Sequence, residues 1–291
     1  MSHRAKSELA WGWFFILPTI VGLVVLNIYP IFSTIFQSFH RTGDFGMNNV
    51  WIGLDNYKKA LVDPKIQQSI WNTLKYMISE VPLSIAISLV LAVLLNKKIV
   101  GRSAYRMIFF LPMVAAPAAI AMVWKWLYNT DYGLINNVFN IRVSWYSDPN
   151  ISLYSIAVIG IWSIIGYNLV LFLAGLQEVP RDYYEAATID GASSTSQFFN
   201  ITLPLISPTI YFVFVTRIIG AMQVFDSIFL VMDRTNPALN KVQSLVYLFY
   251  KYSFEEGNKG AGATIVVILL LITLIITVLQ NIGQKRWVHY N

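Results

Sequence analysis

The stretch that decides the fold of this chain reads Gln177-Glu-Val-Pro-Arg-Asp-Tyr-Tyr-Glu-Ala-Ala-Thr-Ile-Asp-Gly-Ala-Ser-Ser-Thr-Ser-Gln-Phe-Phe-Asn-Ile-Thr-Leu-Pro-Leu-Ile-Ser-Pro208. Pro180 suits the first turn of a helix, and the acidic residues that follow favour the positive end of a helix dipole. Gly191 can take the left-handed backbone conformation that ends a helix. The stretch therefore begins with a predicted helix over about 181–190.

A second short helix is expected directly after the first. Ser193 or Ser194 can accept a hydrogen bond from the backbone of the following turn and so cap this helix. The helix is expected to end before Leu203-Pro204, because proline disfavours a helical conformation of the residue before it. The two helices form a bent pair that is too short to span a membrane and too ordered for a flexible linker.

One face of the first helix consists mainly of small residues. Tyr184, Ala187, Thr188 and Gly191 follow the spacing that places side chains on one side of a helix. Small side chains let another surface come close, so this face is expected to dock into a cleft. A capped amphipathic helix that simply lies in the membrane interface is the other interpretation.

On both sides of this stretch the chain consists of long apolar runs separated by charged segments. A bilayer core needs roughly 20 mostly apolar residues per helix, and backbone groups inside hydrocarbon must pair within their own segment. The runs of this length lie at about 10–31, 76–95, 107–127, 151–172, 208–232 and 261–279. The expected fold is therefore an all-α membrane protein with six transmembrane helices.

The composition agrees with this prediction and excludes other classes of protein. Of the 291 residues, 56% are hydrophobic and 12% are charged, whereas soluble domains carry about 25% charged residues. The net charge of +6 comes from Lys and Arg residues scattered between apolar runs, so nucleic-acid binding is not expected. The absence of cysteine excludes a disulfide framework, a thiolate metal site and a cysteine nucleophile.

The distribution of basic residues predicts which side of the membrane each loop faces. Lys97, Lys98, Arg102 and Arg106 crowd the short connection at 96–106. Short loops rich in Lys and Arg stay in the cytoplasm, and an even number of spans places both termini on that same side. The expected segments are a cytoplasmic head over 1–9, a transmembrane domain over 10–279 with the cytoplasmic loop 177–207, and a cytoplasmic tail over 280–291.

The loop and several segments outside it resemble one family of transport proteins. Glu185-Ala-Ala followed by Asp190-Gly-Ala resembles the EAA loop of the permease subunits of ABC importers. The segments that look like the carbohydrate-uptake branch, related to the maltose and glycerol-phosphate transporters, are Trp51-Ile-Gly-Leu-Asp-Asn-Tyr57, Asn72-Thr-Leu74, Val81-Pro-Leu83, Phe109-Phe-Leu-Pro112 and Gly133-Leu-Ile-Asn136. The resemblance covers roughly 10–285 and implies the type I ABC importer permease fold, with the first loop helix as the coupling helix.

The resemblance also implies a role for the loop. Its first helix seats in a groove of a cytoplasmic ATPase and transmits closure of the ATPase to the membrane helices. The coupling residues carried over from the family are Glu185, Ala186, Ala187, Asp190, Gly191 and Ala192. The chain contains no G-x-x-x-x-G-K-[ST] sequence, which would cradle nucleotide phosphates, so it is expected not to be an enzyme and to draw its energy from a partner.

The implied assembly is an importer in a bacterial or archaeal cytoplasmic membrane that works by alternating access. The implied partners are a paralogous second permease subunit that forms a heterodimer with this chain, two ATPase subunits, and an extracytoplasmic solute-binding protein that delivers a sugar or oligosaccharide. ATP and Mg are expected on the ATPase subunits, and no cofactor or metal is expected on this chain.

Several ionisable residues fall at membrane depth, where they are costly and generally face a bundle interior or a watery cavity. They are Glu80, Arg217 and Asp226. Arg217 and Asp226 are separated by about 14 Å along a helix, so they cannot pair with each other. For Glu80 and Arg217, a polar bond between helices that supports packing is at least as good an interpretation as a transport role.

Polar and aromatic residues in spans four and five are candidates for substrate contacts. Gln223 and Asp226 are expected on one helical face beside Phe225, and polar groups next to an aromatic ring suit a sugar. Span four carries Tyr167 and Asn168. In the resembling family the equivalent stretches line the central cavity, which makes Tyr167, Asn168, Gln223 and Asp226 the candidate substrate-binding residues.

Two other classes of function have to be weighed. A secondary sugar transporter driven by an ion gradient is the alternative, since Glu80 and Asp226 could serve a proton or sodium relay. Such a carrier has no need for a cytoplasmic coupling loop, which favours the ATP-driven importer. An enzyme has little support, because His3, His40 and His289 form no metal-ligand pair in the sequence.

Overall fold

The computed structural model describes residues 3–43, 49–97 and 99–288, and only the backbone of residues 3–10. The predicted head and tail therefore lie partly outside the described residues, as does Lys98 of the basic connection. The chain divides into two compact units. Unit 1 comprises residues 1–63 and 248–268, and unit 2 comprises residues 64–247 and 269–291.

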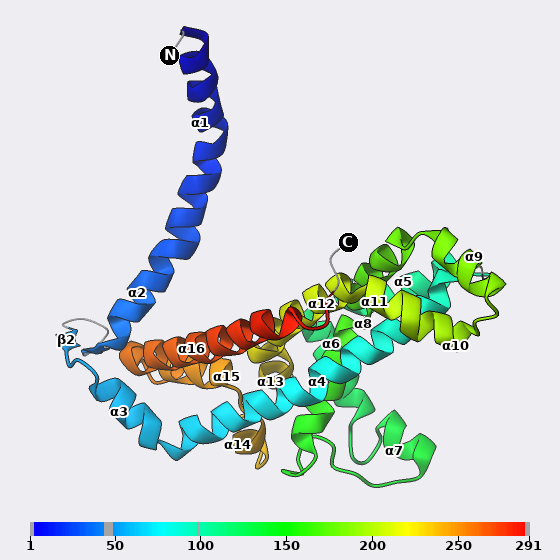
Figure 1. The fold of residues 1–291 in the computed structure, drawn as a ribbon. Helices are drawn as coiled ribbons and strands as arrows, with labels where there is room; N and C mark the ends of the chain where they lie inside the picture. The colour runs from blue at the N-terminus through cyan, green and yellow to red at the C-terminus, as the bar shows by residue number, and fades with distance from the viewer. Residues whose placement is uncertain (1–2, 44–48, 98, 289–291) are drawn as a thin grey trace. The chain divides into compact units, whose positions relative to one another are not determined.

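Unit 1 begins with a long helical segment made of three consecutive parts (Figure 1). They are α1 (His3–Leu23), the π-helical η1 (Val24–Ile28) and α2 (Tyr29–Ser38). The helix continues past the predicted end of the first span to Ser38, and none of its most apolar window is buried. A helix that exposes apolar side chains on all sides suits lipid or another membrane helix.

The end of this helix is held by polar contacts inside unit 1. The other elements of this unit are β1 (His40–Arg41), its antiparallel partner β2 (Val50–Trp51), α3 (Asp55–Val62), the π-helical η4 (Lys251–Glu255) and the first part of α16 (Lys259–Gln284). Asn56 Nδ2 donates to the carbonyl oxygens of Ser38 and His40, both at 2.9 Å. Thr264 Oγ1 also donates to the Ser38 carbonyl, at 3.3 Å. These bonds satisfy the carbonyls that the end of α2 leaves open.

A further polar contact in unit 1 joins the residue after α3 to η4. The Tyr252 hydroxyl donates to Asp63 Oδ2 at 3.0 Å. Burial of the phenol, together with the nearby carboxylates of Asp63 and Glu256, raises the pKa of Tyr252 to about 12. The phenol therefore stays protonated and keeps donating at physiological pH.

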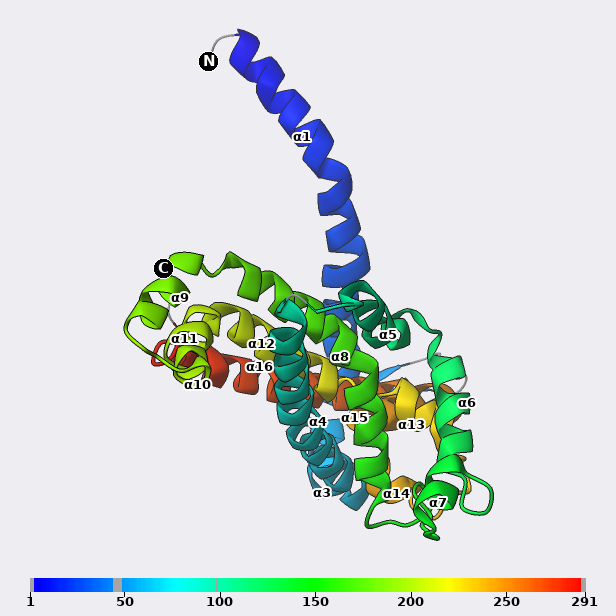
Figure 2. The same ribbon diagram turned by 90° about the vertical axis from the view of Figure 1, so that its right-hand side faces the viewer.

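Unit 2 is built on two long helices that pack along one another, α4 (Pro64–Asn96) and α8 (Ser152–Glu178) (Figure 2). Against them pack α12 (Ser207–Met222), which contacts both, and α5 (Arg102–Val114), which packs mainly on α8. The predicted span 76–95 lies inside α4, and the predicted span 151–172 coincides with most of α8.

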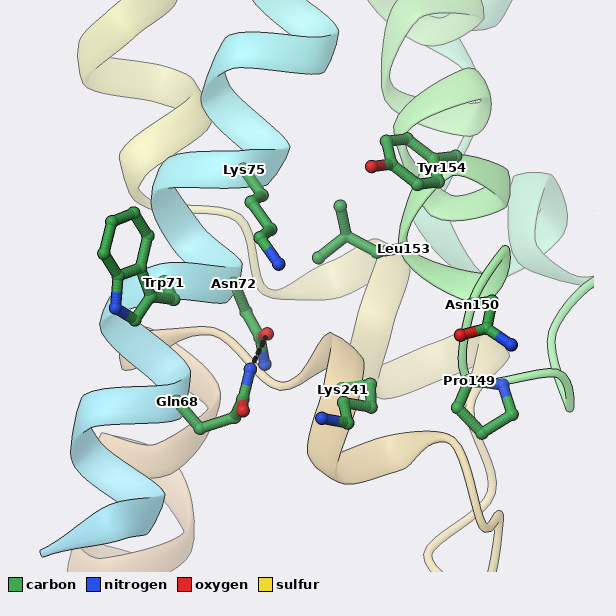
Figure 3. A pocket seen from close by; sticks show the side chains of 9 residues that line it. All are labelled: Gln68, Trp71, Asn72, Lys75, Pro149, Asn150, Leu153, Tyr154 and Lys241. Atoms are coloured by element: carbon green, nitrogen blue, oxygen red, sulfur yellow. Dashed lines mark hydrogen bonds between the residues drawn. The ribbon is translucent and has the colours of Figure 1, made fainter.

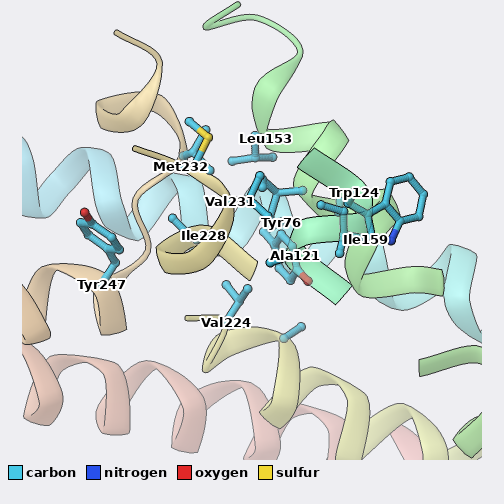
Figure 4. Packing of buried hydrophobic residues seen from close by; sticks show 14 of the residues in the cluster. Tyr76, Ala121, Trp124, Leu153, Ile159, Val224, Ile228, Val231, Met232 and Tyr247 are labelled. Atoms are coloured by element: carbon cyan, nitrogen blue, oxygen red, sulfur yellow. The ribbon is translucent and has the colours of Figure 1, made fainter. Parts of the chain in front are cut away.

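Two clusters of buried side chains join these helices. The first includes Tyr76, Ile156, Met222 and Ile228, which come from four different helices; Figure 4 shows the part of it around Tyr76 and Ile228. The second cluster includes Leu95, Leu169, Phe172 and Val213. Because lipid tails are as apolar as these side chains, close van der Waals packing is what favours this association inside a bilayer.

The predicted span over 107–127 is not one continuous helix. α5 ends at Val114, and α6 (Pro117–Leu127) follows after a bend of 102°. Ala115 and Ala116 between them are extended, with ψ angles of 143° and 136°. Pro117 explains the break, since proline disfavours a helical conformation of the residue before it. The prediction of uninterrupted helix was wrong at these two residues.

The predicted span over 208–232 is also interrupted. α12 ends at Met222, and α13 (Asp226–Val231) begins after three residues that are not helical. The Val224 carbonyl in this break accepts a hydrogen bond of 2.6 Å from Ser244 Oγ. The break is therefore stabilised by a residue distant in sequence, which explains why the local sequence does not predict it.

The remaining elements of unit 2 are short. They are α7 (Leu134–Phe139), α9 (Arg181–Ile189), α10 (Ser194–Gln197), the π-helical η3 (Phe198–Thr202), α11 (Leu203–Leu205), α14 (Leu239–Val242) and the first half of α15 (Leu245–Tyr250). Across the described residues, four helices are long and apolar enough to cross a membrane, or up to six if each bent pair forms one span. The all-α membrane fold is thus confirmed, with two of its expected spans broken.

Close packing of α5 on α8 depends on Gly166. A Cβ atom at this position would meet the Phe109 carbonyl oxygen and lie 2.8 Å from the Phe110 Cα atom. Gly166→Ala is expected to destabilise the protein by about 1–3 kcal/mol, because backbone atoms of α5 cannot easily give way. Thermal unfolding in detergent measures the effect. Gly22→Ala is the matched control, since that glycine has open space around it. Equal melting temperatures for the two variants would contradict this packing.

Candidate functional site

The predicted coupling loop forms a short exposed helix with defined ends. α9 spans Arg181–Ile189, one residue shorter than expected, and extended Pro180 precedes it. Gly191 has a φ of +75°, and its N–H donates to the Thr188 carbonyl at 3.1 Å. The Ala192 N–H donates to the Ala187 carbonyl at 2.9 Å. This is a left-handed glycine cap that satisfies the last carbonyls of the helix, as the sequence predicts.

The second helix of the loop differs from its prediction at the far end. Ser193 caps α10, with its Oγ accepting from the Ser196 N–H at 3.3 Å. The helix does not end before Leu203-Pro204 but continues through η3 and α11. Pro204 lies in the first turn of α11, where a missing N–H costs nothing. The direction changes instead at Ile206, in a bend of 66° between α11 and α12.

Two side chains of the small-residue face of α9, Tyr184 and Thr188, form hydrogen bonds inside the loop, while Thr188 and Gly191 stay exposed, so docking of this face on a partner stays a prediction. Tyr184 Oη and Thr202 Oγ1 are hydrogen-bonded at 2.9 Å. Gln197 Nε2 donates to Thr188 Oγ1 and to the Ala192 carbonyl, both at 3.2 Å. These contacts hold α9 against the helix that leads into α12.

The outward face of α9 is also available to a partner. Glu185 and Ala186 are exposed, and Ile189 is 88% exposed although it is apolar. Asp190 and Gly191 at the end of the helix are exposed as well. Sequence reasoning missed Ile189, which follows Ala186 by three positions and could have been found from that spacing. The other two predicted coupling residues, Ala187 and Ala192, are half-buried.

A cavity lies beside the break in span three. Its volume is about 270 Å³, and it is lined by both sides of the α5–α6 bend, by α8 and by α13. Its polar lining residues are Ser163, Asp226 and Ser227. Non-helical backbone at membrane depth is tolerated where it lines such a cavity or is covered by protein. The two serines were not predicted, and Ser163 precedes Tyr167 by one helical turn.

Of the four predicted substrate contacts, only Asp226 lines this cavity. Gln223 is exposed, but it caps the end of α12 while Asp226 begins α13, so the two residues do not share a helical face as expected. Tyr167 is half-buried. Asn168 is fully buried, and neither polar atom of its side chain has a hydrogen-bond partner among the described residues.

An ion pair joins α4 to α12 inside unit 2. Arg217 Nη2 donates to Glu80 Oε1 at 2.8 Å, with side chains 14% and 0% exposed. The sequence analysis gave a polar bond between helices as one interpretation of Glu80 and of Arg217, but it did not predict that the two residues bond to each other. A lone charge at this depth is costly, and pairing lowers that cost.

The amino-acid sequence is similar to those of known membrane transport proteins. A family model described as binding-protein-dependent transport system inner membrane component matches residues 84–289. A probable ABC transporter permease, YesP of Bacillus subtilis, is 32% identical over 98% of this chain and 93% of its own length. The trehalose/maltose permease MalF of Thermococcus litoralis is 31% identical over 98% of this chain and 99% of its own length.

The fold also matches a solved structure. A bacterial ABC transporter involved in the import of the acidic polysaccharide alginate contains a chain that aligns with a TM-score of 0.84 and 21% sequence identity. The alignment covers 98% of this chain and 99% of that one. At this identity the match supports the arrangement of helices and no more.

The buried ion pair makes a testable prediction about stability. Glu80→Ala and Arg217→Ala should each destabilise the protein by about 3–5 kcal/mol, because each leaves an unpaired buried charge. The free energy of unfolding of the double variant should fall by much less than the sum of the decreases in the two single variants. Unfolding in mixed detergent micelles measures these free energies.

Lys125→Ala is the control for this cycle. Lys125 pairs with Asp233 at 3.1 Å, but the two side chains are 37% and 71% exposed. Removing an exposed ion pair should change the free energy of unfolding by no more than about 1 kcal/mol. Strict additivity of the two buried changes would show that Glu80 and Arg217 do not interact.

Proposed function

This chain belongs to the family of binding-protein-dependent transport system inner membrane components, and on that premise we propose that it is the permease subunit of an ATP-driven importer for a sugar or oligosaccharide. It is a multi-pass inner membrane protein and a transport component. The names of several relatives support the substrate class: trehalose/maltose, arabinooligosaccharides and multiple sugars. One group of relatives is instead named for sn-glycerol-3-phosphate.

The observation that carries the proposal is the exposed outer face of α9. Glu185, Ala186 and the apolar Ile189 are exposed on a helix that is closed at its C-terminal end by Gly191 and hydrogen-bonded to the next helix. An exposed apolar side chain beside small residues suits insertion into a groove of another protein. We assign this groove to a cytoplasmic ATPase. The coupling residues are Glu185, Ala186, Ala187, Asp190, Gly191 and Ala192.

The contacts of α9 give a route by which movement of the ATPase reaches the membrane helices. The Tyr184–Thr202 bond fastens α9 to the helical segment that continues through η3 and α11 into α12. α12 is in turn joined to α4 by the Arg217–Glu80 pair. When ATP closes the ATPase pair, α9 moves with it and the membrane helices switch from one open side to the other.

ATP and Mg belong to the ATPase subunits in this proposal. The sequence of this chain holds no phosphate-binding glycine loop of the G-x-x-x-x-G-K-[ST] type, so the chain itself contributes mechanical coupling and a path. It binds no cofactor of its own.

A second, paralogous permease completes the path in this proposal. The apolar helix Trp11–Ser38 has none of its most apolar window buried within this chain, so it offers a surface to lipid and to a partner subunit. In the proposed heterodimer the cavity beside Asp226 belongs to a passage that needs a wall on the side facing the second permease. The partner supplies that wall.

The orientation follows from the basic residues of the 96–106 connection and from the coupling loop. Both support termini in the cytoplasm, with the segments before α4 and α8 outside it. An extracytoplasmic solute-binding protein then delivers substrate to that outer side. Within the membrane, the candidate substrate contacts remain Tyr167, Asn168, Gln223 and Asp226, with Asp226 supported by its place in the cavity.

The ion-gradient alternative is weakened by one observation. Glu80, one of the two acids that could relay a proton or sodium ion, is engaged by Arg217 at 2.8 Å. A carboxylate that is held by an arginine of a neighbouring helix is not free to bind and release an ion, as a relay requires. The exposed outer face of α9 has no role in such a carrier.

Purification of the chain in mild detergent from its native membranes tests the proposed function. We expect a second permease and an ATPase to co-purify, and one sugar-loaded binding protein to stimulate ATP hydrolysis by the complex. Mass spectrometry identifies the partners. Recovery of the chain alone, under conditions that preserve other complexes, would overturn the proposal and favour the ion-coupled carrier.

Two loop variants sharpen this test. Glu185→Lys reverses a charge on the docking face, and Gly191→Pro cannot adopt the φ of +75° that ends α9. Each should lower stimulated ATP hydrolysis and uptake by about tenfold or more, with normal membrane insertion. Glu256→Lys makes the same charge change at an exposed site outside the loop and should leave ATPase co-purification unchanged.

The assigned substrate contacts make a separate prediction. Tyr167→Ala combined with Gln223→Ala should raise the sugar concentration for half-maximal uptake by about tenfold, because each change removes a polar contact. Tyr132→Ala, at an exposed tyrosine outside the membrane helices, is the control. An unchanged value in the double variant would assign the substrate contacts to the partner permease.

A further inference from the structure

A larger cavity lies beside the start of α8, at the end of that helix far from the coupling loop. Figure 3 shows the side chains that line it. Its volume is about 500 Å³, and it is lined by the first turns of α4, the residues that lead into α8, and α14. α8 separates it from the loop by about 40 Å, the length of that helix. The volume falls within the range of small-molecule sites.

A buried amide fixes the shape of this cavity. Asn72 is 2% exposed, and its Nδ2 donates to the carbonyl oxygens of Asn240 and Gln243 at 3.1 and 3.0 Å. Its Oδ1 accepts from Gln68 Nε2 at 2.8 Å. The segment that carries Lys241 is therefore held against α4, and the wall of the cavity is preorganised.

The cavity carries uncompensated positive charge. Lys75 from α4 and Lys241 from α14 both line it, and no acidic side chain does. Neither lysine forms an ion pair with any other residue that the structure describes. In Figure 3 the Lys75 ammonium group points into the open space. Two ammonium groups in one preformed cavity are complementary to an anion.

The other lining groups indicate what surrounds that anion. Trp71 and Tyr154 are among the lining residues, and as whole residues they are 61% and 53% exposed, which leaves aromatic surface free for apolar contact. The side chain of Asn150 has no hydrogen-bond partner among the described residues, and Gln68 Oε1 likewise has none. Free carboxamides suit hydroxyl groups, and exposed aromatic rings suit the apolar face of a sugar ring.

We infer that this cavity binds a carboxylate-bearing sugar unit, such as a uronic acid residue, at the outer mouth of the permease. The carboxylate lies between Lys75 and Lys241, the ring lies against Trp71 or Tyr154, and hydroxyl groups bond to the free amide of Asn150. The inference rests on the proposed function and narrows it: the imported oligosaccharide is acidic.

Other anions fit the cavity less well. An acidic side chain of a binding protein would satisfy the two lysines but leave the aromatic rings and the free carboxamides without partners. A lipid phosphate would satisfy the lysines, and its chains could cover the rings, but it would leave the carboxamides without partners. A sugar acid engages all three kinds of group at once. The combination of charge, amide and ring thus favours a saccharide.

The test measures equilibrium binding to the purified complex, with its co-purified partners, in nanodiscs of neutral lipid and without the binding protein. The probes are trigalacturonate and its fully methyl-esterified form, which has the same rings and no charge. Trigalacturonate should bind at least about tenfold more tightly than the ester. Lys75→Gln and Lys241→Gln should each weaken its binding by about tenfold, and Lys75→Arg should restore most of it.

Lys58→Gln removes a lysine that lies outside this cavity and should leave binding unchanged. Equal binding of the acid and its ester, or unchanged binding in both lysine variants, would overturn the inference. Variants that lose only stimulation by the binding protein, or only affinity for anionic lipid, would assign the cavity to those partners and likewise overturn it. Co-purification of the ATPase and basal ATP hydrolysis report on the proposed function separately.

Discussion

The arrangement of helices in unit 2 depends on the ion pair between Glu80 and Arg217. Both groups lie in surroundings that would make a lone charge costly, so α4 and α12 cannot separate or slide without exposing one of them to that cost. Apolar packing alone would specify the register less strictly, because lipid competes equally well for apolar faces. The ion pair therefore fixes the register between α12, which follows the coupling loop, and α4, which lines the cavity around Lys75 and Lys241.

Two breaks in the membrane helices border the cavity that is lined by Ser163, Asp226 and Ser227. Pro117 ends one half of span three, and the Ser244 bond to the Val224 carbonyl stabilises the interruption after α12. Non-helical backbone inside a bilayer has to be covered by protein or line a water-filled space. The break at Ala115 and Ala116 lies beside the cavity, and the break after α12 has its Val224 carbonyl bonded to Ser244. Asp226 reaches the cavity because α13 starts anew at that residue.

The coupling loop illustrates how one short helix can serve two surfaces. Its inner face, with Tyr184 and Thr188, is engaged by the next helix of the same chain. Its outer face keeps Glu185 and Ile189 exposed. In the proposed coupling role, the hydrogen bonds of the inner face attach α9 to its own chain and leave the outer face free for a partner. The outer cavity at the far end of α8 is equally preorganised, through Asn72.

The amino-acid sequence by itself determined the all-α membrane fold, the caps of α9 at Pro180 and Gly191, and the family resemblance. These features depend on the amino-acid composition and on residues within one or two helical turns, such as Pro180 and Gly191, so they can be read from the sequence. Only the tertiary structure decided that Glu80 pairs with Arg217, that Gln223 and Asp226 lie on different helices, and that Tyr184 of α9 bonds to Thr202. Each of these follows from contacts between residues far apart in the chain, such as Val224 with Ser244, and periodicity along one helix carries no information about them.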